Sequence, residues 1–299
     1  MMSTTEAAAD ELCASCGIAG GGDDKTKLKR CGACGLVRYC SIACQRDHRT
    51  EHKNACKKRV AELRDELLFK QPESSHEGDC PICCLPISLD NDKSIMMTCC
   101  SKKICDGCVH SYELRIFQEK REPTCPFCRH PAPKSKEEED RNIMKRVTAK
   151  DPVAMTHIGL VRYRSGDYGG AFRYQNLAAE LGHAGGHFQL SCLYRKGQGV
   201  EKDRKKEVYH LEQAAIGGHT KARYNLGCEE DQNGRINRAV KHWIIAAALG
   251  NDASLDALKD CFRGGVVSKE DFAAALRAHQ AAVDATKSPQ REAAEEAQI

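Results

Sequence analysis

The stretch CGACGLVRYCSIACQRDHRTEHKNAC, residues 31–56, decides the fold of the N-terminal part of this chain. Its potential metal ligands form three pairs with two or three residues between partners: Cys31 and Cys34, Cys40 and Cys44, and His52 and Cys56. A Cys-x-x-Cys pair suits a tight turn around a metal ion, and residues four apart lie on one face of a helix. We therefore expect metal ligands, rather than a large apolar core, to hold this segment together.

The same spacing continues on both sides of this stretch and gives two runs of eight soft ligands. The first run is Cys13, Cys16, Cys31, Cys34, Cys40, Cys44, His52 and Cys56. The second run is Cys80, Cys83, Cys99, Cys100, Cys105, Cys108, Cys125 and Cys128. Eight ligands fill two tetrahedral zinc sites and leave no open coordination position. We therefore expect four structural zinc ions, no catalytic residue among the ligands, and function on the surfaces that zinc organises.

The N-terminal sequence MMSTTEAAADEL lacks a basic start followed by an apolar run, so no signal peptide is expected. No stretch of the chain approaches the length of a membrane span. We expect a cytosolic or nuclear protein without membrane association, in which thiols stay reduced. In that setting metal binding is favoured over the alternative, a disulfide framework.

Aromatic residues make up only 5% of the 299-residue chain, which is low for one large core but suits metal-stapled modules and alanine-rich helices. The net charge of +4 is unevenly distributed, because residues 25–70 contain thirteen Lys and Arg against five Asp and Glu. This basic stretch could contact nucleic acid or an acidic partner. A solvated face of a finger is the simpler interpretation, so nucleic acid is not the partner we expect.

Residues 13–56 resemble a MYND zinc finger. All eight ligand positions match, as do the Tyr39-Cys40-Ser41 and Cys44-Gln45 signatures. The resemblance implies interleaved sites, one of Cys13, Cys16, Cys40 and Cys44 and the other of Cys31, Cys34, His52 and Cys56. Arg49 stands where the family often has a tryptophan that helps to form its peptide-binding surface. His48 is an extra imidazole, which we expect to face solvent on a helix, with a role as a substitute ligand as the alternative.

Residues 79–133 resemble a RING finger, in the variant with cysteine at all eight ligand positions. The segments Cys80-Pro-Ile-Cys83, Cys105-x-x-Cys108 and Cys125-Pro-Phe-Cys128 have the order and spacing of that family. The resemblance implies one site of Cys80, Cys83, Cys105 and Cys108 and another of Cys99, Cys100, Cys125 and Cys128. The adjacent Cys99 and Cys100 depart from the usual spacing. Cys84 is either a spare thiol or a substitute ligand.

Three further residues of the second finger lie where RING ubiquitin ligases contact a ubiquitin-conjugating enzyme. Ile82 and Pro126 each lie between paired ligands, and Arg129 follows the last ligand. The resemblance implies that Ile82 and Pro126 contact the conjugating enzyme and that Arg129 bridges this enzyme and its ubiquitin. A planar guanidinium suits that role because it can donate to two carbonyl groups at once. The alternative is that Ile82 and Pro126 pack the zinc knuckles and Arg129 is a surface charge.

The C-terminal half contains an internal repeat. The segments AAELGH, AAIGGH and AAALGN end at residues 183, 219 and 251, and their shared glycines are 36 and 32 residues apart. This period predicts pairs of short helices in a solenoid, with Gly182, Gly218 and Gly250 as left-handed caps. The pattern resembles the Sel-one-like helical repeat, whose inter-helix loop matches residues 194–203. Cys192 and Cys228 occupy equivalent repeat positions, where we expect small buried core residues, with a metal or redox role as the alternative.

The expected fold class is multidomain: two small zinc-stapled modules, a MYND finger and a RING cross-brace, followed by an all-α helical-repeat solenoid. The expected order is a disordered leader at 1–12, the MYND finger at 13–56, a helix and linker at 57–78, the RING-type finger at 79–133, a charged linker at 134–150, the repeats at 151–287 and a disordered tail at 288–299.

These resemblances imply a RING-type ubiquitin ligase or ligase-like adaptor. Such a protein has no nucleophile of its own and holds a charged conjugating enzyme in a reactive pose. The MYND finger and the repeats would recruit partner or substrate proteins. The alternative is a non-catalytic scaffold in which both fingers only bind proteins. MYND fingers also accompany SET methyltransferase domains, but residues 131–299 resemble helical repeats instead, so we do not expect that activity.

Overall fold

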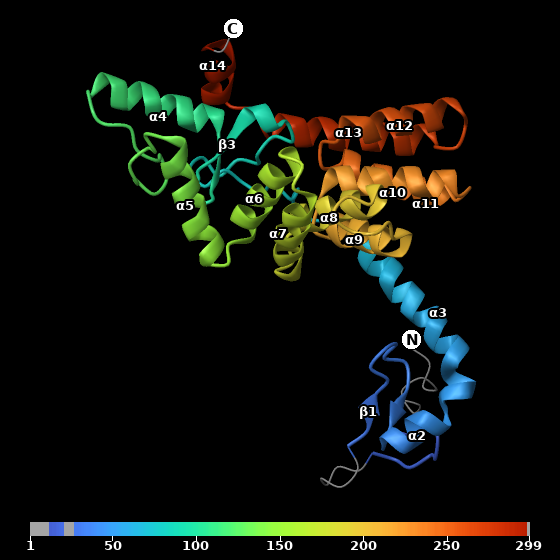
Figure 1. Cartoon of the computed structure of the whole chain (residues 1–299). Helices are drawn as coiled ribbons and strands as arrows, with labels where there is room; N and C mark the ends of the chain where they lie inside the picture. The colour runs from blue at the N-terminus through green and yellow to red at the C-terminus, as the bar shows by residue number, and fades with distance from the viewer. Residues whose placement is uncertain (1–11, 21–26, 298–299) are drawn as a thin grey trace. The chain divides into compact units, whose positions relative to one another are not determined.

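The computed structural model describes residues 12–20 and 27–297, and the chain divides into two compact units, residues 1–70 and residues 71–299 (Figure 1). The leader expected at 1–12 lies outside the described residues, except for Leu12, whose backbone pairs with that of Ala19. Among the described residues, no helix has both the length and the apolar character needed to cross a membrane.

The first unit is a small finger whose core consists mainly of cysteines. Strand β1 (Lys29–Arg30) pairs antiparallel with β2 (Arg38–Tyr39), and the hairpin leads into α2 (Ile42–Asp47) and α3 (Arg49–Leu68). Helix α2 begins at Ser41 because its hydroxyl accepts a hydrogen bond from the Cys44 N–H at 3.1 Å. Tyr39 is buried together with three cysteines. So small an apolar core depends on metal crosslinks for its stability.

The second unit begins with another finger of hairpin and helix. A short 3₁₀ turn η1 (Asn91–Lys93) precedes strand β3 (Ser94–Met96), which pairs antiparallel with β4 (Lys103–Cys105), and α4 (Asp106–Gln118) follows. Ile87, Ile104 and Val109 form a buried cluster with three cysteines. The cysteine pairs lie in the loops around these elements and at the start of α4.

The structure corrects the charged linker expected at 134–150, because α5 (Lys136–Thr148) forms there. The Ser135 hydroxyl caps this helix by accepting from the Glu138 N–H, at 3.3 Å. Acidic residues occupy its first turn and basic residues its last, which complements the helix dipole. Asn142 and Ile143 are buried, and the helix packs on α6. The charged residues that led to the linker prediction therefore lie on the solvent face of an ordered helix.

Eight helices after α5 form four consecutive pairs within the described residues. Their bounds are α6 (Pro152–Arg164), α7 (Tyr168–Glu180), α8 (Ala184–Lys196), α9 (Arg204–Ile216), α10 (Thr220–Gln232), α11 (Ile236–Ala247), α12 (Asp252–Arg263) and α13 (Lys269–Asp284). The repeated alanine pairs are buried on α7, α9 and α11. Gly182, Gly218 and Gly250 have φ values of 77°, 79° and 86°, which confirms the predicted left-handed caps.

Small residues allow the paired helices to cross closely. A Cβ atom at Gly159 of α6 would lie 2.4 Å from the Gln175 Nε2 atom of α7. A Cβ atom at Gly227 of α10 would lie 2.3 Å from the Trp243 Nε1 atom of α11. Larger residues at either position would force the helices apart, which explains the glycines shared by these units.

The tail expected to be disordered at 288–299 instead forms α14 (Pro289–Ala297), which packs on α4 (Figure 1). Arg291 and Ala294 are buried. The helices approach closely, because a Cβ atom at Gly107 of α4 would lie 2.7 Å from the Arg291 backbone nitrogen. The second finger, the repeats and this helix thus belong to one compact unit. The sequence predicts separate domains at 79–133 and 151–287.

Candidate metal centres and the adjoining cavity

The first finger brings its eight predicted ligands together in two clusters. One contains Cys13, Cys16, Cys40 and Cys44, and the other contains Cys31, Cys34, His52 and Cys56. Within each cluster the ligand atoms lie within 4.8 Å of one another. The Sγ atoms are 3.6 Å apart between Cys16 and Cys40 and 4.0 Å apart between Cys31 and Cys56. Thiolates bound tetrahedrally to one zinc ion at 2.3 Å lie about 3.8 Å apart, so these clusters fit zinc.

The second finger also contains two clusters of this size. One contains Cys80, Cys83, Cys105 and Cys108, and the other contains Cys99, Cys100, Cys125 and Cys128. The Sγ atoms are 3.8 Å apart between Cys83 and Cys105 and 3.9 Å apart between Cys100 and Cys125. The adjacent Cys99 and Cys100 both enter one cluster despite their unusual spacing. In both fingers the pairs alternate between clusters along the chain, which is the interleaved arrangement that the resemblances imply.

The remaining cysteines lie outside these clusters. All nineteen cysteines belong to the described residues and are free thiols, so the structure gives no support to a disulfide framework. Cys192 and Cys228 are half-buried in the repeats rather than fully buried, and Cys228 packs against the core cluster around Trp243. Burial raises the pKa of Cys192. A half-buried position against an apolar cluster indicates a packing role for Cys228.

The residue that directly follows a cysteine pair has a left-handed backbone at five places in the two fingers. The φ values are 72° at Gly17, 69° at Gly35, 57° at Cys84, 56° at Ser101 and 63° at Arg129. The N–H group of this residue closes the knuckle turn, as when Cys84 donates to the Cys80 carbonyl at 2.8 Å and Arg129 donates to the Cys125 carbonyl at 3.0 Å. Cys84 is exposed and outside the clusters, so its position is that of a turn residue with a spare thiol.

His48 lies outside the clusters but contacts them. It is half-buried, whereas the sequence predicts a solvent-facing residue. Its Nδ1 atom lies 3.1 Å from the Tyr39 hydroxyl, and its ring stacks on that of His52 with centroids 5.8 Å apart. His48 therefore packs between Tyr39 and His52 at the edge of the second cluster, a contact that its i, i+4 spacing from His52 could have indicated.

Thiols within one cluster have opposite pKa shifts. Burial raises the pKa of Cys31, but hydrogen bonds from the Cys34 and Ala33 backbones outweigh burial and lower this pKa to about 6. In the same cluster, burial and the neighbouring Cys34 and Cys31 raise the pKa of Cys56 to about 11. The first thiolate that forms therefore opposes ionisation of the next. A bound cation removes this opposition, so the chemistry of the cluster fits a divalent metal ion.

The residues predicted to contact a conjugating enzyme lie on the knuckles of the second finger. Ile82 is 42% exposed, Arg129 is exposed and Pro126 is half-buried. The Arg129 guanidinium carbon lies 5.5 Å from the centroid of the Tyr112 ring, in cation–π contact. Phe127, which the sequence interpretation did not include, is also 42% exposed. The sequence could have indicated Phe127, because it is a large apolar residue beside Pro126 and between two ligands.

Arg291 of α14 reaches the first knuckle of the second finger. Its guanidinium donates to the carbonyl oxygens of Pro86 at 2.7 Å and Leu85 at 3.2 Å, and it lies 3.4 Å from Cys83 Sγ. The residue is only 6% exposed. A hydrogen bond to a ligating sulfur orients the ligand and stabilises its thiolate. No local sequence signal predicted this contact, because more than 200 residues separate Arg291 from the knuckle.

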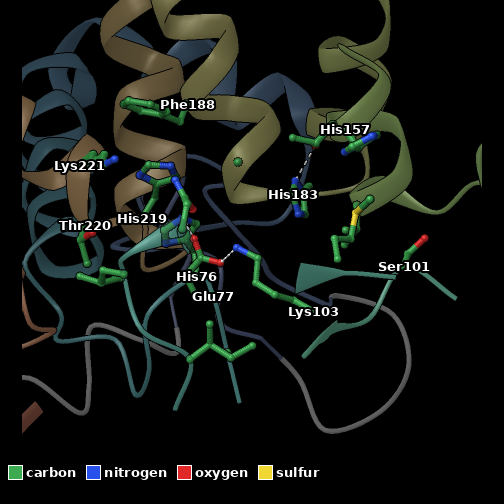
Figure 2. A pocket seen from close by; sticks show the side chains of 18 of the residues that line it. His76, Glu77, Ser101, Lys103, His157, His183, Phe188, His219, Thr220 and Lys221 are labelled. Carbon is green, nitrogen blue, oxygen red and sulfur yellow. Dashed lines mark hydrogen bonds and ion pairs between the residues drawn. The ribbon is translucent and has the colours of Figure 1, made fainter. Parts of the chain in front are cut away.

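A cavity of about 550 Å³ lies where the second finger meets the repeats (Figure 2). His76 lies on the finger side of the cavity, and its backbone N–H donates to the Gly218 carbonyl at 3.1 Å. Its ring stacks on His219 with centroids 3.9 Å apart, and Phe188 also stacks on His219 at 4.1 Å. His219 caps α10 by accepting from the Ala222 N–H at 3.2 Å. The repeated Gly-His turn therefore both caps a helix and binds the finger, which the sequence did not indicate.

The Glu77 carboxylate, which lines this cavity, is compensated by its neighbours. Burial raises the pKa of Glu77, but His76 and Lys103 outweigh burial and lower this pKa to about 2. Glu77 forms ion pairs with both of them (Figure 2). Burial lowers the pKa values of His183 and His219, so both imidazoles are neutral near pH 7. A partly aromatic wall with a paired carboxylate suits packing and binding.

Comparisons with known proteins identify one part of the chain. Residues 13–56 match the family model of the MYND finger, so the chain contains a MYND finger. The mouse protein DAP3-binding cell death enhancer 1 is 23% identical, over 47% of this chain and 35% of its own length. The chain therefore spans about a third of that curated relative.

Two solved structures resemble 57% of this chain. A Sel1 repeat protein from Oxalobacter formigenes has a TM-score of 0.45 and 22% identity, with 52% of its chain covered. A protective antigen of uropathogenic Escherichia coli with an SLR fold has a TM-score of 0.43 and 20% identity, with 37% of its chain covered. The helical-repeat architecture of this chain is established by its own helix pairs and left-handed caps.

Proposed function

We propose that the sixteen clustered residues bind four zinc ions and that the second finger recruits a ubiquitin-conjugating enzyme to a protein-interaction scaffold. The MYND finger and the helical repeats support the scaffold role, because both kinds of module present surfaces for protein partners. The RING resemblance of residues 79–133 and their interleaved clusters support the role of the second finger. All four clusters require reduced thiols, which favours the cytosol or the nucleus as the location of the protein.

The exposure of Ile82 is the observation that carries this proposal. A residue that only packed the knuckle would be buried, whereas 42% of Ile82 is exposed. Phe127, on a knuckle of the other cluster in this finger, is exposed to the same extent. Apolar side chains held in fixed positions by zinc are suited to bind the apolar surface of another protein.

Arg129 would act on the bound conjugating enzyme rather than on the substrate directly. Its contact with Tyr112 places the guanidinium beside the last knuckle. From there it could donate to carbonyl groups of the enzyme and its ubiquitin at the same time. The finger would then accelerate transfer by positioning the two proteins, without a nucleophile of its own.

An in vitro ubiquitination assay with a panel of conjugating enzymes tests this proposal. We expect activity with at least one enzyme and a loss of about tenfold or more for Ile82→Ala at unchanged zinc content. Ile95→Ala is the control, because it truncates a 49% exposed isoleucine on β3 of the same finger. Inactivity of the wild-type chain with every enzyme would leave the second candidate, a non-catalytic scaffold, which the unusual adjacent Cys99 and Cys100 favour.

A further inference from the structure

The cavity of about 550 Å³ between the second finger and the repeats has polar groups that the fold itself does not use (Figure 2). Both of its walls belong to one compact unit, residues 71–299. Helices α8, α10 and α12 all begin at this cavity, because their cap residues His183, His219 and Asn251 line it. The N-terminus of a helix carries partial positive charge on N–H groups that lack intrahelical partners, so three helices bring this charge to one cavity.

Asn251 presents an amide donor to the cavity. Only 9% of this residue is exposed. Its Oδ1 atom caps α12 by accepting from the Ser254 N–H at 2.9 Å and from the Ser254 hydroxyl at 2.7 Å. The Nδ2 group therefore remains as a donor, and among the described residues it has no hydrogen-bond partner. A donor buried to this extent costs free energy unless another group accepts from it.

Thr220 supplies a second unused donor, from the neighbouring repeat (Figure 2). The residue is 1% exposed, yet its hydroxyl has no hydrogen-bond partner in the part of the chain that the structure describes. It is the first residue of α10 and directly follows the cap residue His219. Two buried donors from adjacent repeats thus line one cavity, and acceptor oxygens of a ligand would give each of them a partner.

The charged residues of the lining favour an anion. Three lysines and two carboxylates line the cavity: Lys102, Lys103, Lys221, Glu77 and Asp79. Glu77 already pairs with Lys103. Lys102 and Lys221 are exposed and form no ion pair within the described residues, and Asp79 can compensate only one of them. The cavity therefore combines unused donors, helix N-termini and an excess of positive charge.

We propose that this cavity binds a small organic molecule through a phosphate group. A phosphate offers negative charge and several acceptor oxygens, which match the unused donors, the lysines and the helix N-termini. The half-buried apolar side chains of Leu89, Met96 and Phe188 line the same cavity and would pack against the organic part of the molecule. The volume of about 550 Å³ is typical of a small-molecule site.

Isothermal titration calorimetry with the zinc-loaded, full-length chain tests the proposal. The probes are naphthyl phosphate, which combines an apolar body with a phosphate, naphthol, which lacks the phosphate, and inorganic phosphate, which lacks the apolar body. We expect naphthyl phosphate to bind about tenfold or more tightly than either of the other two probes. Its affinity should fall as salt is raised.

Substitutions of the two unused donors and of one lysine locate the site. Asn251→Asp keeps the capping oxygen but removes the donor, so we expect a folded chain that binds naphthyl phosphate about tenfold or more weakly. Thr220→Val removes the hydroxyl at nearly constant volume and should weaken binding by about threefold. Lys221→Gln should weaken it by about threefold as well.

The matched control is Lys205→Gln. Lys205 and Lys221 are both exposed and each is the second residue of a helix of 13 residues, but only Lys221 lines the cavity. The control should alter affinity by less than about twofold. Circular dichroism and zinc content verify that each variant folds. If a variant at a buried position fails to fold, Lys221→Gln still gives the comparison.

Three outcomes would overturn the proposal. Equal binding of naphthol would mean that the cavity has no anion subsite, equal losses from Lys205→Gln and Lys221→Gln would mean that only general surface charge acts, and absence of binding by naphthyl phosphate would exclude the site. None of these outcomes affects the ubiquitination assay with Ile82→Ala, because Ile82 does not line this cavity.

Discussion

Arg129 combines a backbone requirement with a proposed side-chain role. Its φ of 63° matches the values at Gly17 and Gly35, which occupy the same knuckle position in the first finger. A non-glycine residue in the left-handed region costs about 1 kcal/mol. Cys84 and Ser101 also hold this conformation without being glycine, so the backbone tolerates a side chain here, and the proposed role of Arg129 concerns its guanidinium alone.

Replacing Arg129 by glycine separates these two contributions. We expect Arg129→Gly to leave the free energy of unfolding unchanged or to raise it by about 0.5 kcal/mol, and to slow ubiquitin discharge about tenfold. Cys84→Gly is the control, because it makes the same backbone change at another knuckle of this finger. Denaturant unfolding and single-turnover discharge provide the two measurements. If a folded Arg129→Gly variant discharges ubiquitin at the wild-type rate, the bridging role is ruled out.

His210 gives the second unit a pH dependence that is independent of the metal clusters. Its Nδ1 atom lies 2.9 Å from that of His187, and its ring stacks on Tyr194. Burial lowers its pKa from 6.5 to about 4, so the unfolded chain binds a proton in a range where the folded chain does not. The fold is therefore destabilised as the pH falls from 6.5 toward 4.

We expect His210→Gln to reduce this acid destabilisation by about 1–2 kcal/mol, after allowance for solvent screening. The measurement is urea unfolding of both proteins at neutral and at mildly acidic pH. Loss of metal at low pH affects both proteins equally, so the difference between them isolates His210. Identical losses of stability in the two proteins would contradict the assigned pKa shift.

Among the elements, those whose signals are local could be predicted and those that depend on distant neighbours could not. The ligand clusters follow from cysteine spacing, because a knuckle or one helical turn is set by a few adjacent residues. The left-handed helix caps could also be predicted from local sequence, because a glycine follows each alanine pair: Gly182, Gly218 and Gly250. By contrast, α5 and α14 each bury only two side chains, and the charged and polar residues around those positions led to the prediction of a linker and a tail.

Helix α14 should stabilise the metal centre that it contacts. We expect Arg291→Ala to lower the free energy of unfolding of the second unit by about 2–3 kcal/mol, because Leu85 and Pro86 lose their hydrogen-bond donor. We also expect zinc to transfer to a chelator about tenfold faster. Glu296→Ala, at an exposed position of the same helix, is the control. Equal release from the two variants would contradict the role of Arg291.

For the whole molecule, the sequence predicts the order of the modules but not their grouping. The polar character of residues 71–78 predicts a linker, yet His76 stacks on His219 and bonds to Gly218. A contact between residues more than 140 positions apart leaves no periodic or spacing signal. One edge of the repeats is therefore covered by residues 71–78 and the second finger.

This grouping predicts different effects for ligand substitutions in the two fingers. Cys105→Ser disrupts the finger that packs on the repeats, so we expect the helices to melt about 5–10 °C lower. Cys40→Ser disrupts the separate first unit and should leave that transition unchanged. Thermal unfolding followed by far-UV circular dichroism makes the comparison. Coincident transitions for both variants would show that the second finger and the repeats do not unfold together.

We propose that the four clusters of thiols and imidazole are zinc centres that organise the surfaces of this chain. Native mass spectrometry of the full-length chain, purified without chelators, counts the bound ions. The four clusters predict four zinc ions per chain. A count of two ions or fewer in folded, reduced protein would contradict it.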